Sequence, residues 1–126
     1  MMATAGKKRW VIPCGHIPLA TTGKEPDFLS QDRIAVLNLN KDPVKIRLTF
    51  FYPDQEPSGG YEVEIKGERV RKIRINDLID PFPVELEKDY SLLIEADALV
   101  VVQFLKMNTS KRDLAITGTI AFGTDK

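Results

Sequence analysis

A thiol and an imidazole lie two residues apart near the start of the chain, at Cys14 and His16. Such a pair can act as nucleophile and base when a third group orients the imidazole and an oxyanion site completes the set. Gly15 separates the two residues and Pro18 follows, so we expect the strand that carries them to end here. No third partner is evident. The sequence favours a structural cysteine and a loop histidine, and it predicts that the protein is not an enzyme.

Carboxylates are the other reactive groups, and four of them lie beside turn residues at Asp54, Glu56, Asp77 and Asp80. Carboxylates could hold a hard cation, but EF-hand spacing is absent, and one histidine with one cysteine is too few for a standard zinc site. Two acids could also hydrolyse a glycoside, although so short a chain rarely forms a deep substrate cleft. Aspartate beside proline is an ordinary turn signal. We therefore predict no metal and no cofactor.

The same acids belong to two loop segments, FYPDQEPSGGY (51–61) and NDLIDPFPV (76–84). Each segment places acidic and amide side chains next to aromatic residues and prolines, and functional residues are common on loops that a rigid scaffold supports. Acids and amides bind ligand hydroxyl groups, while an aromatic ring offers a flat apolar face. We expect the two loops to fold back onto one polar pocket that binds a small, sugar-like molecule without catalysis.

A basic run occupies residues 69–74, with Arg69, Arg71, Lys72 and Arg74. Successive residues of a strand project to opposite sides, so only part of the run can form one patch. Phosphate or DNA contact is one interpretation. A solvated sheet face is the other, and the formal net charge of zero favours it.

Period-2 alternation of apolar and polar residues dominates the chain and indicates strands. The clearest pair predicts an antiparallel hairpin with Tyr52 opposite Tyr61, in which an outward-facing Phe51 suggests a subunit contact. We predict an all-β, single-domain antiparallel sandwich, jelly-roll-like, with seven or eight strands and at most one short helical turn near 76–79. The expected strands cover residues 10–14 (at a sheet edge), 33–40, 44–52, 61–66, 68–75 (with a bulge near 71–72), 91–95, 99–107 and 114–122.

Composition limits the remaining possibilities. The 126 residues are enough for one domain, 1–126, with its own hydrophobic core. Eighteen basic residues balance eighteen acidic ones, so no overall field attracts nucleic acid or anionic lipid. A single cysteine excludes an internal disulfide, and the first residues lack the apolar run of a signal peptide. We expect a cytoplasmic protein.

Several ordered motifs resemble the sensory rhodopsin transducer family, which comprises small soluble proteins named for a cytoplasmic partner of a microbial photoreceptor. The resemblance spans nearly the whole chain. The motifs are WVIPCGHIP (10–18), EPDF (25–28), LN (37–38), FYPDQEPSGGY (51–61), RINDLIDPFPV (74–84), VVVQ (100–103) and TIA (119–121).

The resemblance implies a β-sandwich that assembles as a cyclic homotetramer and signals by binding. It also implies a small polar ligand, with a membrane receptor's cytoplasmic tail or DNA as alternative partners. His16 stands where the family more often has an aromatic residue, which weakens a metal or proton-transfer role for it. Turn or core roles remain alternatives for the expected ligand-facing residues, which are those at motif positions: Trp10, Glu25, Tyr52, Asp54, Glu56, Asn76, Asp77 and Gln103.

Overall fold

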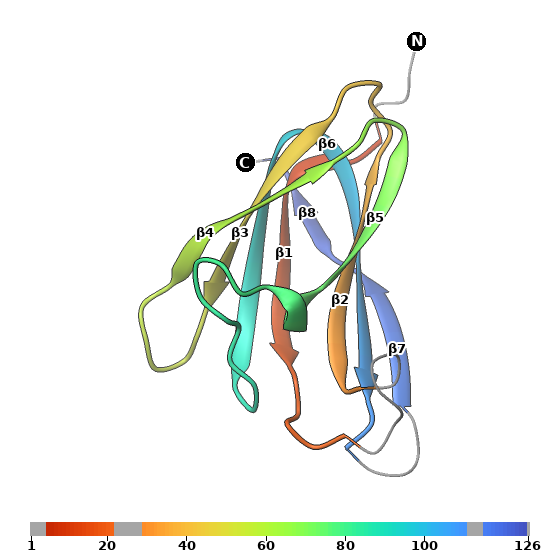
Figure 1. Ribbon diagram of the computed structural model, residues 1–126. Coiled ribbons are helices and arrows are strands. Elements are labelled where there is room, and N and C mark those ends of the chain that lie inside the picture. Colours follow the sequence, from red (N-terminus) through yellow and green to blue (C-terminus); the bar gives the residue numbers. More distant parts are fainter. Residues whose placement is uncertain (1–4, 22–28, 111–114, 126) are drawn as a thin grey trace.

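One long strand, β6 (Asp89–Asn108), connects the two layers of the molecule (Figure 1). Its first half pairs with β1 and β3, and its second half pairs with β2 and β7. Even-numbered residues from Tyr90 to Phe104 point into the core through both halves, with only Ala98 half-buried among them. The inward phase does not change at Asp97, so the two separate strands expected at 91–95 and 99–107 are one continuous strand. The computed structural model describes residues 5–21, 29–110 and 115–125.

All the strands that the structure describes pair antiparallel and connect through β6. One layer has the order β4-β3-β6-β1-β8, and the other has the order β5-β2-β6-β7. The predicted all-β sandwich with one short helical turn is confirmed. The remaining elements are β1 (Lys7–His16), β2 (Gln31–Asn38), β3 (Val44–Phe51), β4 (Ser58–Ile65), β5 (Arg69–Arg74), the 3-10 turn η1 (Ile75–Asp77), β7 (Ala115–Ile120) and β8 (Phe122–Thr124).

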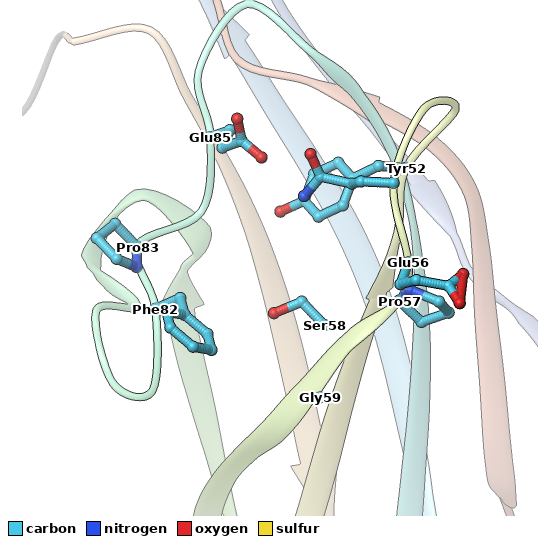
Figure 2. Close-up of a pocket in the computed structure, with 9 residues that line it drawn as sticks. Tyr52, Glu56, Pro57, Ser58, Gly59, Phe82, Pro83 and Glu85 are labelled. Carbon is cyan, nitrogen blue, oxygen red and sulfur yellow. The ribbon is translucent and has the colours of Figure 1, made fainter.

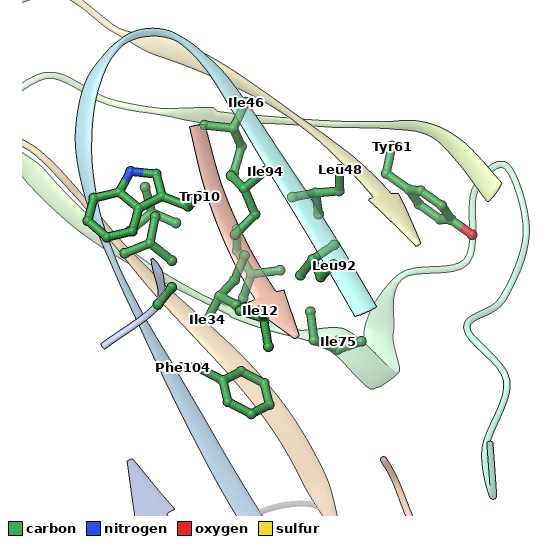
Figure 3. Packing of buried hydrophobic residues seen from close by; sticks show 14 of the residues in the cluster. Trp10, Ile12, Ile34, Ile46, Leu48, Tyr61, Ile75, Leu92, Ile94 and Phe104 are labelled. Carbon is green, nitrogen blue, oxygen red and sulfur yellow. The ribbon is translucent and has the colours of Figure 1, made fainter. Parts of the chain in front are cut away.

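The core forms between the layers, where the inward side chains of the strands meet (Figure 3). Strand β3 alternates buried and outward residues along its length, as its sequence predicts. Full burial of one aliphatic or aromatic side chain stabilises a protein by about 1.5–3 kcal/mol. The core therefore makes the sandwich a rigid support for its loops. Its largest fully buried members include Tyr61, Tyr90, Phe50, Ile17, Ile34, Ile46, Leu48, Ile65, Ile75, Leu92 and Ile94.

The β3–β4 hairpin forms, but its register differs from the prediction. Leu48, not Tyr52, lies opposite Tyr61, and Phe50 lies opposite Ser58. The register shifts between these two pairs because the second strand begins at Ser58 and includes an extra residue there. Gly60 adopts a φ of 91° at this bulge, a conformation that glycine takes without strain. The loop between the two strands comprises residues 52–57.

Three other predicted elements also differ in detail. Strand β5 pairs evenly with β2 without the expected bulge, because Val70 simply faces outward and is 61% exposed. The expected last strand is divided into β7 and β8, which pair with β6 and β1. The backbone N–H of Ala121, between them, donates to Val102 O at 3.2 Å. Strand β1 does not stop before His16, and its pairing with β6 shifts between Ile12 and Gly15, around Pro13.

No helix within residues 5–21, 29–110 and 115–125 is long and apolar enough to cross a bilayer.

Candidate functional site

The two segments singled out in the sequence meet at one end of the sandwich and enclose a pocket of about 470 Å³, which we call the loop pocket. Figure 2 shows Tyr52 and Ser58 on the β3–β4 side, and Phe82 and Glu85 on the opposite loop. The carboxylate of Glu56 points away from that opposite loop. The complete lining consists of Tyr52, Gln55, Glu56, Pro57, Ser58, Gly59, Phe82, Pro83 and Glu85.

Tyr61 ties the two sides of the loop pocket together. Its ring is buried in the core and packs edge-on against Phe50, with ring centroids 5.1 Å apart. Its hydroxyl donates a hydrogen bond of 2.6 Å to the backbone oxygen of Phe82 and lies 3.4 Å from Ser58 Oγ. The opposite loop is therefore attached to a core residue of β4, so the pocket's width depends on a rigid part of the fold.

Lys88 forms a second connection across the rim, and we call its surroundings the rim cluster. Its ammonium lies 3.2 Å from Asp54 Oδ1 and 3.3 Å from Glu85 Oε1, and it donates to Gln55 Oε1 at 2.9 Å. The same nitrogen lies 5.6 Å from the centroid of the Tyr52 ring, within the range of a cation–π contact. One ammonium thus joins the loop after β3 to the segment before β6.

The rim cluster favours positive charge. Desolvation lowers the pKa of Lys88, but hydrogen bonds to Asp54 and Glu85 outweigh it, and the net pKa is raised above the usual lysine value. Burial raises the pKa of the Tyr52 phenol, and a backbone hydrogen bond with Glu85 opposes part of that change. Tyr52 is therefore a neutral hydroxyl at physiological pH, able both to donate and to accept a hydrogen bond.

Three of the eight expected ligand-facing residues lie at or beside the loop pocket. Tyr52 and Glu56 line it, and Asp54 contacts Lys88 at its rim. Asn76 and Asp77 lie at η1 instead: the Asn76 amide donates to Ser30 O at 3.0 Å, and Asp77 pairs with Arg74 at 3.7 Å.

The other three expected residues are placed differently again. Trp10 is a core residue, and its indole N–H donates to Val100 O at 3.1 Å and to Lys7 O at 3.0 Å. Gln103 is an exposed residue in the second half of β6, where it pairs with Ala35 of β2. Glu25 lies outside the described residues.

The pocket also contains residues that sequence analysis did not nominate, chiefly Gln55, Ser58, Glu85 and the neighbouring Lys88. Gln55 and Ser58 belong to the FYPDQEPSGGY motif and could have been found from it. Lys88 has no local signal, because a lysine three residues after a glutamate is common on any exposed segment. Its main partners, Asp54 and Gln55, are more than thirty positions earlier in the chain.

A second cluster of polar groups, centred on Asp32 of β2, lies inside the fold, and we call it the buried cluster. Asp32 is 1% exposed and accepts hydrogen bonds from the Tyr90 hydroxyl at 2.6 Å and from the His16 backbone N–H at 3.2 Å. The Lys106 ammonium lies 3.0 Å from its other oxygen. Burial, together with the charge of Asp32, raises the pKa of Tyr90. This carboxylate joins β1, β2 and β6, and its oxygens are occupied.

The side chains of Cys14 and His16 contact other groups and not each other, so they do not form a nucleophile–base pair. The Cys14 thiol faces Gly15 O at 3.9 Å. The His16 ring lies between two acids, with Nδ1 2.8 Å from Asp89 Oδ1 and Nε2 3.5 Å from Glu87 Oε1. Within the part of the chain that the structure describes, three or more histidine, cysteine or acidic side chains do not converge as metal ligands.

The fold and the pocket define a small antiparallel β-sandwich protein with a loop pocket at one end. Its sequence matches the family model described as Anabaena sensory rhodopsin transducer over residues 5–123. The chain belongs to this family, and the relation supports a role in signalling.

Solved structures agree with this assignment. The crystal structure of Thermotoga maritima 1070 superposes with a TM-score of 0.82 at 27% sequence identity, covering 95% of this chain and 97% of that chain. The Anabaena sensory rhodopsin transducer superposes with a TM-score of 0.74 at 32% identity, covering 81% of this chain and 89% of that chain. A search of curated proteins gave no match.

Proposed function

We propose that this protein is a non-enzymatic signalling protein that binds a small polar, sugar-like molecule in the loop pocket and relays its occupancy to a partner. The observation that carries the proposal is the pocket of about 470 Å³ enclosed by two segments that are distant in sequence. Its volume falls within the range of small-molecule sites, about 300–1,000 Å³. Family membership supports the signalling part of the proposal.

The groups at the loop pocket fit a polyhydroxylated ligand. Tyr52 and Ser58 supply hydroxyl groups, and Glu85 supplies a carboxylate that accepts hydrogen bonds. Phe82 is 63% exposed and offers a flat apolar face, against which the carbon side of a sugar ring can pack. The hydrogen bond between Tyr61 and Phe82 O connects the pocket to the core, which is present only in the folded protein. A ligand that binds this pocket would therefore stabilise the folded protein.

A thermal-shift screen with monosaccharides, amino sugars and nucleotides tests this proposal. A ligand that binds only the folded state raises the melting temperature of the protein. At a ligand concentration about one hundred times Kd, the free energy of unfolding rises by about 2.7 kcal/mol. Phe82→Ala should abolish the shift. Val70→Ala is the matched control, because Val70 is similarly exposed, at 61%, but does not line the pocket. If no compound in the screen produces a shift that depends on Phe82, the small-molecule function is wrong.

The proposal includes a cytoplasmic homotetramer, an expectation that comes from the family resemblance. Exposed apolar residues on β7 and β8, Ile120 at 64% and Phe122 at 67%, are compatible with subunit contacts. Light scattering coupled to size-exclusion chromatography measures the mass directly. A monomer at micromolar concentration would refute the tetramer and leave the pocket proposal standing.

Docking on the cytoplasmic tail of a membrane receptor is a second candidate function. Apolar side chains near the loop pocket favour it, since Phe51 and Leu86 are each 40% exposed and Phe82 is 63% exposed. A pull-down from the organism's own membranes tests this candidate. Capture of a receptor that needs no small ligand and that is lost in Phe51→Ala would support docking over ligand binding.

DNA contact through β5 is a third possibility, because Arg69, Arg71 and Lys72 are all exposed on that strand. Part of this charge already serves the fold, since the Arg71 guanidinium donates to Glu64 O at 2.9 Å. DNA binding would weaken steeply with salt and with charge reversal at Arg71 and Lys72. Binding that is indifferent to both changes would exclude this role.

A further inference from the structure

The rim cluster contains an ammonium group held by the features that a cationic ligand would require. Lys88 Nζ contacts two carboxylates, Asp54 and Glu85, and one amide oxygen, Gln55, beside the aromatic face of Tyr52. Carboxylates and an aromatic face together are a common environment for bound amines. Three of these four partners, Tyr52, Gln55 and Glu85, line the loop pocket. The Lys88 ammonium therefore lies at the edge of the space that the proposed ligand would occupy.

Charge in the two segments that form the pocket is strongly unbalanced. Residues 52–60 and 79–88 carry five carboxylates, and Lys88 is their one ammonium or guanidinium group. No lysine or arginine is among the residues that line the loop pocket. Apart from Lys88 at the rim, a phosphorylated or carboxylated ligand would meet like charge there, whereas a protonated amine would meet opposite charge.

The carboxylates around Lys88 are accessible enough to solvent for a ligand's ammonium to replace that of Lys88. The Asp54 and Glu85 side chains are 65% and 45% exposed, while the Lys88 side chain is 23% exposed. Exposed ion pairs of this kind contribute little to stability, so replacing one ammonium by another costs little.

From this arrangement we infer that the loop pocket binds a polar molecule carrying a protonated amine, whose ammonium replaces that of Lys88 on Glu85 and Asp54. This inference rests on the proposed function and narrows its ligand class to amino sugars and similar hydroxylated amines. Lys88 is then an internal competitor: it holds the two loops together when the pocket is empty and gives up its partners when the ligand enters.

The test compares D-glucosamine with N-acetyl-D-glucosamine by isothermal titration calorimetry, at a mildly acidic pH where the amine is protonated. The two sugars differ in the charged group, so glucosamine should bind at least about tenfold more tightly. D-glucose 6-phosphate serves as the anionic comparison and should bind most weakly. Added salt should weaken glucosamine binding more than N-acetylglucosamine binding.

Two substitutions should change the affinity for glucosamine in opposite directions. Glu85→Gln removes the carboxylate and should weaken binding about tenfold. Lys88→Met removes the competing ammonium and should strengthen binding about threefold or more. If Lys88 only braced the loops, both substitutions would weaken binding. Glu62→Gln is the matched control, because Glu62 is exposed on β4 outside the pocket.

The outcomes separate the inference from the proposed function. Tighter binding of N-acetylglucosamine or glucose 6-phosphate, or weaker binding in Lys88→Met, overturns the amine inference while the ligand-binding function stands. Absence of binding by all three sugars in the wild-type protein and in Lys88→Met overturns the inference as well. Only the absence of any hit in the wider thermal-shift screen also removes the small-molecule function.

Discussion

The buried cluster and the rim cluster contain the same chemical groups in two different environments. Each combines a lysine ammonium, at least one carboxylate and a tyrosine. At Asp32, which is 1% exposed, the carboxylate is surrounded by three donors. At Lys88 the carboxylate partners are 65% and 45% exposed.

Solvent exposure decides what each cluster can do. A buried carboxylate that loses its partners remains desolvated, so its contacts are fixed for as long as the protein is folded. An exposed carboxylate can exchange a partner for water or for a ligand at little cost. The buried cluster therefore joins the strands, and the rim cluster is where the proposed ligand would bind.

Among the substitutions that test this comparison, a replacement of Asp32 should have the largest effect on the free energy of unfolding. Asp32→Ala leaves the Lys106 ammonium and the Tyr90 hydroxyl without their shared acceptor, and we expect a loss of about 3–5 kcal/mol in the free energy of unfolding. Asp54→Ala, the matched change in the rim cluster, should cost less than about 1 kcal/mol. Urea denaturation measures both. Similar losses for the two variants would show that exposure does not distinguish the clusters.

Gly15→Ala should be the next most damaging change, because it displaces Tyr90 from the buried cluster. A Cβ at position 15 would lie 2.3 Å from Tyr90 Cζ, and overpacking of this kind costs about 1–3 kcal/mol. Gly59→Ala is the control, since its Cβ would lie 3.4 Å from Thr49 Oγ1, near ordinary contact distance. Thermal unfolding of both variants should show a clear loss only for Gly15→Ala. Equal melting temperatures would contradict the packing of Tyr90 against Gly15.

Removing only the Tyr90 hydroxyl should have an effect of similar size, and this effect should depend on pH. Tyr90→Phe deletes one hydrogen bond to Asp32 and should cost about 1.5–3 kcal/mol at neutral pH, because the acceptor is charged. Burial raises the pKa of Tyr90 in the folded state, so its contribution is complete below the unfolded-state pKa of about 10 and is lost as pH rises above that value. Wild-type stability should therefore fall more steeply than that of Tyr90→Phe in alkaline solution. Parallel stability curves above about pH 10 would contradict the coupling.

The smallest effect is expected in the rim cluster itself. A double-mutant cycle with Lys88→Met and Asp54→Ala should give a small coupling energy that decreases as salt is added. The cycle sharpens the comparison because it measures the coupling in a Lys–Asp pair, and the buried cluster contains the same kind of pair between Lys106 and Asp32. A large coupling energy that is insensitive to salt would mean that the rim cluster is structural as well.

Local patterns predicted some features of this protein well. The alternation in 44–51 specifies which face of β3 is buried, because every second side chain of a strand lies on the same side. The prolines and glycines of 51–61 marked the loop that forms half of the pocket. The hairpin register was predicted wrongly by four residues, because alternation fits registers that differ by an even number of residues equally well.

The buried acid and the division of the last strand were not predictable in this way. Asp32 stands between Gln31 and Arg33, a polar run that looks like a solvated strand end, yet tertiary contacts from Tyr90 and Lys106 surround it. Likewise, 114–122 reads as one alternating segment, and only pairing with β6 and β1 separates β7 from β8.

By itself, the sequence determined the all-β class, the positions of most strands and the two polar, proline-containing loops, because each depends on neighbouring residues and on a period of two. The tertiary structure alone decided that those loops share a pocket, that Lys88 reaches across its rim, and that Asp32 is enclosed while Asp54 is accessible. These properties depend on contacts between residues that are distant in the chain, and solvent exposure is set only when the two layers of the sandwich pack together.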